Sequence, residues 1–131
     1  MAYKTLSLDV AEGIAHVQFI RGAEFNTMNR AFWPEMVAVF GEIEQDPSAR
    51  VVVFSAHGKH FTSGLDLNDF AVGLMASEGE PSRKAEALRR TVLHMQDSMS
   101  VVDRCRLPVL VAVQGACIGG GIDLILSLMP I

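Results

Sequence analysis

Two segments of this chain follow the same order: an apolar strand, then a glycine turn with an acidic residue, then a helix. The first strand covers residues 51–54 and precedes a turn at residues 63–66, and the second covers residues 109–113 and precedes a turn at residues 119–123. Both strands are rich in valine and too short for helices, so we expect them to be buried and to pair in parallel. Paired in this way, they would bring the two glycine turns together at one side of the sheet.

An antiparallel hairpin is predicted at the start of the chain from alternating apolar and polar residues. Its strands cover residues 5–10 and 14–20, with a turn at Glu12 and Gly13. The first glycine turn then leads into a short helix, and the stretch at residues 77–82 is predicted to be mobile. The predicted order is β-β-α-β-(α)-α-β-α, which is typical of an α/β fold.

Two longer helices are predicted from apolar residues that recur every three or four positions. The first begins near Ala31, where Asn29 caps it and Pro34 falls in its first turn. Its predicted apolar stripe consists of Trp33, Met36, Val37, Phe40 and Ile43. The second begins at Ser82, and its predicted apolar stripe consists of Leu88, Thr91, Val92, Met95, Met99 and Val102.

Composition limits the functions open to the chain. Its 131 residues suit one domain, and a net charge of −4 offers no basic surface for nucleic acid. No apolar stretch approaches the ~20 residues that span a bilayer, so no membrane partner is expected. The first residues resemble neither a secretory signal nor an organelle presequence, which predicts a cytoplasmic location.

Cysteine and histidine give no sign of a metal site. Cys105 and Cys117 lack the CxxC spacing and are predicted to be small buried hydrophobic residues. His57 and His60 lie three positions apart, but no third ligand is evident. We therefore expect no bound metal, and we expect this histidine pair to belong to a surface loop.

The glycine turns themselves can do chemistry. A turn that delivers glycine to the start of a helix leaves backbone N–H groups unpaired, with the positive end of the helix dipole behind them. Two such N–H groups that converge form an oxyanion hole, suited to a thioester oxygen that gains negative charge. Neither turn matches the GxGxxG or GxxxxGK[ST] pattern. A tight turn or close helix packing also explains either glycine turn by itself, so the pattern leaves both roles open.

Four runs of residues make this sequence resemble the enoyl-CoA hydratase/isomerase, or crotonase, family. They fall at residues 26–36, 50–55, 58–67 and 108–124, and include Phe-Thr-Ser-Gly-Leu-Asp-Leu from position 61 and Cys-Ile-Gly-Gly-Gly-Ile-Asp-Leu from position 117. Within the family, these two motifs resemble those of the dienoyl-CoA isomerases. The resemblance implies an α/β fold of the crotonase-like (ClpP/crotonase) type with a ββα spiral core. Residues 1–131 would form the N-terminal part of one such domain.

The resemblance also implies roles for individual residues. The N–H groups of Leu65 and Gly120 would form the oxyanion hole, and Asp123 would act as a general acid or base. The residues implied to bind substrate are Ser63, Gly64, Leu65, Asp66, Leu67 and Gly120. Asp123 would otherwise simply complement the dipole of its helix. We expect Asp66 to brace its loop, while Lys59 would either meet coenzyme A phosphates or be solvated.

The implied reaction is the isomerisation of a dienoyl-CoA in fatty-acid β-oxidation. The partner would be an acyl-CoA, with no cofactor beyond the coenzyme A that the substrate carries. An enoyl-CoA hydratase, with Asp123 in place of the expected glutamate, and a non-catalytic acyl-CoA-binding remnant are the alternatives. Family members form homotrimers or hexamers. Because the family pattern is lost after Ile125, the chain is predicted to be truncated, to lack the assembly helices and a second catalytic carboxylate, and to be weakly active or inactive.

Overall fold

The computed structural model describes residues 2–76 and 78–128. Its elements follow the predicted order, with a short 3-10 helix added at Gly22–Glu24. The strands are β1 (Leu6–Ala11), β2 (Ile14–Phe19), β3 (Val51–Ala56) and β4 (Val109–Val111). The helices are α1 (Phe32–Gln45), α2 (Leu67–Met75), α3 (Pro81–Asp103) and α4 (Gly120–Leu126). Residue 77, at the start of the stretch predicted to be mobile, lies outside the described residues.

The strands form one sheet in the order β1-β2-β3-β4. β1 and β2 pair antiparallel, and the turn between them places Glu12 at φ 53° and Gly13 at φ 84°. β2, β3 and β4 then pair in parallel. The hairpin and the parallel pairing are both confirmed, and the parallel strands send their following turns to one side of the sheet.

One face of the sheet carries the core. The register aligns Ala15 with Val52 and Val17 with Phe54, and all four side chains are buried. α1 covers this face, and the Phe19 ring lies 5.5 Å from that of Phe32 and 5.1 Å from that of Phe54. The buried residues of α1 are Phe32, Met36, Val39, Phe40 and Ile43. Sheet and helix therefore share a single hydrophobic core.

The opposite face of the sheet is more open, which corrects the expectation of strands buried on both faces. In β3, Val52 and Phe54 are buried whereas Val51 and Val53 are half-buried. β4 is three residues long and lies at the edge, and Leu110 is 59% exposed. The strand predicted at residues 109–113 is thus shorter and less buried than expected, because Val109 and Val111 face the core while Leu110 alternates to the open face of the sheet.

The predicted apolar stripe of α1 is buried in part. Asn29 Oδ1 accepts from the Ala31 and Phe32 N–H groups, and Pro34 lies in the first turn, as expected. The stripe residues Met36, Phe40 and Ile43 are buried. Trp33 is half-buried against the core, Val37 is 41% exposed, and both side chains also line a cavity.

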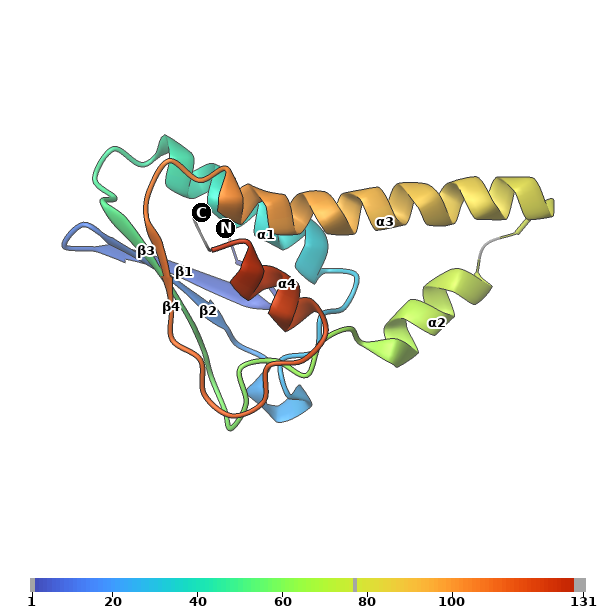
Figure 1. Ribbon diagram of the computed structural model, residues 1–131, viewed down its shortest axis with the longest axis horizontal. Coiled ribbons are helices and arrows are strands. Elements are labelled where there is room, and N and C mark those ends of the chain that lie inside the picture. The colour runs from blue at the N-terminus through green and yellow to red at the C-terminus, as the bar shows by residue number, and fades with distance from the viewer. Residues whose placement is uncertain (1, 77, 129–131) are drawn as a thin grey trace.

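Only the C-terminal part of α3 reaches the core. Figure 1 shows this long helix lying along α1 at one end and extending past the body of the molecule at the other, where α2 lies near it. Its buried residues are Ser98, Met99 and Val102, all near its end. Leu88 and Val92, predicted to be part of a core stripe, are exposed. No helix among the described residues is long and apolar enough to cross a membrane.

Candidate active site

The stretches that lead into the two glycine turns are joined by backbone hydrogen bonds. The Phe61 N–H donates to Gln114 O over 2.7 Å, and the Thr62 N–H donates to Ala116 O over 3.2 Å. The Ile118 N–H returns a bond to Thr62 O, also over 3.2 Å. These bonds form a short parallel ladder beyond β3 and β4, so the two turns are held as one unit.

The glycine turns touch each other directly. A Cβ atom at Gly64 would lie 2.8 Å from Ile118 O, and one at Gly119 would lie 3.6 Å from the Gly64 Cα. Both glycines have a positive φ, +87° and +57°, which other residues rarely adopt. The prediction that the turns would face each other is confirmed, and glycine is needed for the close approach.

Each turn leaves one N–H group without a partner. Gly64 O accepts from the Met28 N–H over 2.8 Å. Because C=O and N–H point in opposite directions across a trans peptide, the Leu65 N–H faces away from Met28. Gly120 is the first residue of α4, where N–H groups have no helical acceptor. Within the described part of the chain, neither the Leu65 nor the Gly120 N–H has a hydrogen-bond partner.

Leu65, Gly120 and Asp123 line one cavity of about 750 Å³. Its apolar wall includes Trp33, Met95 and Met99. The Asp123 side chain is exposed, and no residue of the described chain forms a hydrogen bond or ion pair with its carboxylate. The cavity therefore combines two unpartnered N–H groups with an exposed carboxylate that has no partner among the described residues.

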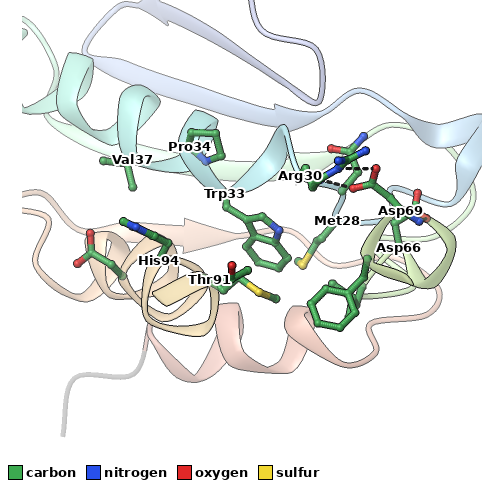
Figure 2. A pocket seen from close by; sticks show the side chains of 14 residues that line it. Met28, Arg30, Trp33, Pro34, Val37, Asp66, Asp69, Thr91 and His94 are labelled. Atoms are coloured by element: carbon green, nitrogen blue, oxygen red, sulfur yellow. Dashed lines mark hydrogen bonds and ion pairs between the residues drawn. The ribbon is translucent and has the colours of Figure 1, made fainter. Parts of the chain in front are cut away.

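A second cavity, of about 550 Å³, shares Leu65, Trp33 and Met95 with the first. Figure 2 shows the Trp33 indole and the Met28 side chain pointing into this space, between α1 and the residues of α3. On the α2 side, Arg30 Nε and the Arg30 N–H donate to the Asp69 carboxylate over 3.0 and 2.7 Å. The two cavities therefore adjoin at these three shared residues.

Asp66 braces the first glycine turn. Its Oδ1 accepts from the Asp69 N–H and caps α2, and its Oδ2 accepts from the Thr27 hydroxyl. Arg21 Nη2 lies 3.8 Å from the same carboxylate. The bracing role expected of Asp66 is confirmed by these contacts, which occupy both oxygens.

Other predicted site residues lie away from both cavities. Ser63 donates its N–H to Phe25 O in the neighbouring loop, and Leu67 is 73% exposed. Gly64 is buried at the contact between the turns. Lys59 is exposed and lines neither cavity.

The histidine and cysteine residues have structural positions. His60 Nδ1 accepts from the Ala116 N–H over 2.9 Å, so this side chain joins the two stretches that precede the glycine turns. His57 faces Gln18. Cys105 and Cys117 are half-buried rather than buried, and burial raises the pKa of both thiols. Among the described residues, no group of three His, Cys, Asp or Glu side chains is placed to hold a metal ion.

Sequence reasoning missed three residues that shape the site. Trp33 belongs to the predicted apolar stripe and packs partly against the core, but its spacing gives no sign that it also lines both cavities. Met28 packs beneath Gly120, where an added Cβ would lie 2.6 Å from its Sδ. The Thr62 hydroxyl donates to Asn26 O in a neighbouring loop and accepts from the Gly64 N–H in its own turn. Its place directly before Ser63 and Gly64 was the only signal of its importance.

The sheet with its paired glycine turns defines an α/β protein of the crotonase fold. An enoyl-CoA hydratase from Shewanella pealeana superposes on 95% of the chain with a TM-score of 0.84 and 24% identity, and 44% of that structure is covered. Residues 9–128 match the family described as Enoyl-CoA hydratase/isomerase, and the chain belongs to that family.

Two relatives extend the comparison. The mitochondrial Delta(3,5)-Delta(2,4)-dienoyl-CoA isomerase of Mus musculus is 42% identical over 94% of this chain and 38% of its own length. The peroxisomal Delta(3,5)-Delta(2,4)-dienoyl-CoA isomerase of Arabidopsis thaliana is 36% identical over 95% of this chain and 46% of its own length. The chain thus spans less than half the length of these relatives.

The names of these relatives correct one expectation. They are described as mitochondrial and peroxisomal, which contradicts the cytoplasmic location predicted from the first residues of the chain. The inference failed because it used the lack of a recognisable leader as evidence for a compartment, and a targeting signal is separate from the folded domain.

Proposed function

We propose that the chain contributes the thioester-binding part of an acyl-CoA isomerase site of the dienoyl-CoA isomerase type. The observation that carries this proposal is the pair of unpartnered N–H groups, from Leu65 and Gly120, at one cavity. In the proposed complex both groups donate to the thioester oxygen of an acyl-CoA. The identity to dienoyl-CoA isomerases supports this choice of substrate.

The proposed oxyanion hole acts on charge that develops during the reaction. When a proton leaves the carbon chain next to the thioester, the electron pair moves onto the thioester oxygen and forms an enolate. Fixed N–H donors stabilise this charge without having to reorient, and one such donor is worth about 10²- to 10³-fold in kcat in other enzymes. The proposed chemistry moves protons alone and needs no cofactor beyond the coenzyme A of the substrate.

Asp123 is proposed to be the general acid or base. It lies three residues after Gly120 on α4 and lines the same cavity, with its carboxylate free of protein partners in the described chain. A carboxylate in this position is suited to exchange a proton with the bound acyl chain. Its position in the first turn of α4 would also complement the helix dipole.

A second candidate function is acyl-CoA binding with little or no turnover. Isomerisation takes a proton from one carbon and returns a proton to another further along the chain, and a second group normally serves the return step. Among the described residues that line the 750 Å³ cavity, Asp123 is the only carboxylate. This observation favours a low rate for the chain by itself.

The rise in absorbance as a 3,5-dienoyl-CoA becomes a 2,4-dienoyl-CoA, whose double bonds are conjugated with the thioester carbonyl, tests the proposal. We expect Asp123→Asn to lower the rate about 10²- to 10⁴-fold, since that is the usual contribution of a general acid or base. Asp103→Asn is the matched control, because Asp103 is an exposed aspartate of α3 outside both cavities.

Three other outcomes are informative. Saturable acyl-CoA binding without turnover supports the second candidate. Hydration of a simple enoyl-CoA would identify a hydratase, with Asp123 in place of glutamate. A chain that neither binds acyl-CoA nor acts on it contradicts the proposal.

A further inference from the structure

We propose that Thr62 is a positioning residue for the oxyanion hole: its hydroxyl holds the Gly64 N–H and thereby presents the Leu65 N–H to the cavity. The effect on substrate rests on the proposed function. The hydrogen bonds of Thr62 do not, and they can be tested without any ligand.

The Thr62 hydroxyl has two partners in a buried setting. The side chain is fully buried, and Oγ1 donates to Asn26 O over 2.7 Å while it accepts from the Gly64 N–H over 3.1 Å. A hydroxyl has one proton, and a carbonyl can only accept, so the direction of both bonds is determined. Thr62 thus links the first glycine turn to the loop at residues 21–29.

The bond from the Gly64 N–H to the Thr62 hydroxyl ends the ladder between the two turns at Gly64. In a regular parallel ladder, the Thr62–Cys117 bridge would be followed by a bond from the Gly64 N–H to Ile118 O. Gly64 instead has a φ of +87°, and its N–H turns to the Thr62 hydroxyl. Ile118 O remains close to Gly64, 2.8 Å from where a Cβ would lie. Ile118 O already accepts from the Gly121 N–H over 3.1 Å, so the Thr62 hydroxyl is the acceptor that takes up the Gly64 N–H.

The direction of the Leu65 N–H follows from the way in which Gly64 is held. Gly64 is held on its N–H side by Thr62 Oγ1 and on its C=O side by the Met28 N–H, at 3.1 and 2.8 Å. Glycine has no Cβ to restrict it, so these two bonds set its φ and ψ. Without the hydroxyl, the Gly64 N–H would lose this acceptor, and the peptide that carries the Leu65 N–H would be held by the Met28 N–H alone and could rotate.

Two substitutions separate hydrogen bonding from packing at Thr62. The Thr62 Cγ2 methyl packs against Gly121, where an added Cβ would lie 2.5 Å from it. Thr62→Val keeps this methyl and the branched shape but has no hydroxyl. Thr62→Ser keeps the hydroxyl and loses the methyl. A residue that only fills space would tolerate valine better than serine, whereas a positioning residue would tolerate serine better.

Acetoacetyl-CoA is a suitable probe because its ionised 1,3-dicarbonyl group is an enolate with its own ultraviolet absorbance. The measurement is the pH at which the bound probe becomes an enolate. We expect about tenfold less enolate at a given pH in Thr62→Val than in the wild type, since misplaced donors lose much of their effect on developing charge. Thr62→Ser should restore most of the difference. Equal midpoints for wild type and Thr62→Val, or a larger shift for serine than for valine, would overturn the inference.

Amide hydrogen exchange tests the positioning in the free chain. The wild type should protect the Gly64 amide and leave the Leu65 amide unprotected. In Thr62→Val, the Gly64 amide should exchange about tenfold faster or more, because it loses its acceptor. The Ile118 amide, which donates to the backbone O of residue 62, is the internal control. An unprotected Gly64 amide in the wild type would overturn the inference, even if the valine variant failed to fold.

The two measurements distinguish the inference from the function on which it rests. A wild-type chain that does not bind acetoacetyl-CoA would count against the proposed function, and the exchange data would then decide the role of Thr62 alone. Binding with an unchanged enolate midpoint in Thr62→Val would leave the proposed function intact and overturn the positioning role.

Discussion

At the scale of single residues, Gly64 and Gly41 differ in what a methyl group would meet. Gly64 has a φ of +87° and lies against Ile118 O, whereas a Cβ at Gly41, within α1, would have no atom within 4 Å beyond its own stretch of helix. We expect Gly64→Ala to lower the free energy of unfolding by about 1–3 kcal/mol, the usual cost of a strained backbone conformation. Gly41→Ala should raise it by about 0.5–1 kcal/mol, because alanine suits a helix interior better. Urea unfolding midpoints measure both, and a shift of the same sign in the two variants would contradict this account.

Asp66 allows a second prediction at this scale. Its Oδ1 caps α2 through the Asp69 N–H, and its Oδ2 accepts from the Thr27 hydroxyl. Asp66→Ala removes both acceptors and should lower the free energy of unfolding by about 1 kcal/mol, as is typical of a lost N-cap. Asp66→Asn keeps a good capping group and should lose clearly less. Equal losses in thermal or urea unfolding would show that capping is not the source of the effect.

At the scale of elements, the N-terminal segment is tied to α1 by carboxylates. Glu35 accepts from the Lys4 and Thr5 N–H groups over 2.8 and 2.9 Å, and the Tyr3 hydroxyl donates to Glu42. Burial, the hydrogen bond to Glu42 and the negative charges of Glu42 and Glu35, in that order, raise the pKa of Tyr3 from 10.0 to about 12. The folded chain therefore keeps the Tyr3 proton at a pH where the unfolded chain loses it.

Alkaline titration tests this attachment. A raised pKa contributes stability that is present below pH 10.0 and is lost as the pH rises through about 12. Since Tyr3 is the only tyrosine, tyrosinate absorbance reports on it alone. We expect a midpoint near 12 in the folded chain and a lower midpoint in Glu42→Gln, which removes one negative charge. A midpoint at 10.0 in the folded wild type would disprove the attachment.

The helices show how far periodicity can be taken. Spacing and caps predicted where α1 begins, because Asn29 and Pro34 act locally. They do not show that Trp33 and Val37 line a cavity, since a stripe identifies an apolar face without showing whether that face meets the sheet or a cavity. In α3, Leu88 belongs to the predicted core stripe, yet it is exposed because the N-terminal part of the helix extends beyond the body (Figure 1).

The site was predictable where chain order determines geometry. Parallel strands followed by glycine turns were enough to predict that the turns meet. The contacts that hold them were not predictable, because they join loops distant in sequence: the Thr62 hydroxyl reaches a carbonyl 36 positions away, at Asn26. The Asp123 side chain is exposed. Its exposure also depends on contacts between distant segments, and a local sequence pattern does not predict such contacts.

At the scale of the whole molecule, the sequence predicted the order and class of the elements but overestimated their burial. Strands and helices of an α/β domain usually carry apolar residues on every face that another element covers. Here several of those faces are open within the described residues, among them the outer edge of β4 and the outer side of α4. The exposed apolar side chains from β4 to α4 are Leu110, Val113, Ile118, Ile122 and Leu126.

This segment predicts self-association. An edge strand offers unpaired N–H and C=O groups to another chain, and a charged side chain on the strand discourages such pairing. Sedimentation over a range of concentrations should therefore show association of the wild type, and Leu110→Lys should weaken it. Leu93→Lys is the matched control, because Leu93 is a leucine of α3 with 47% exposure, comparable to the 59% of Leu110. If both lysine variants associate equally, the association is caused by exposed apolar area in general and not by the β4 edge. A wild type that stays monomeric at high concentration would show that the edge is protected in solution.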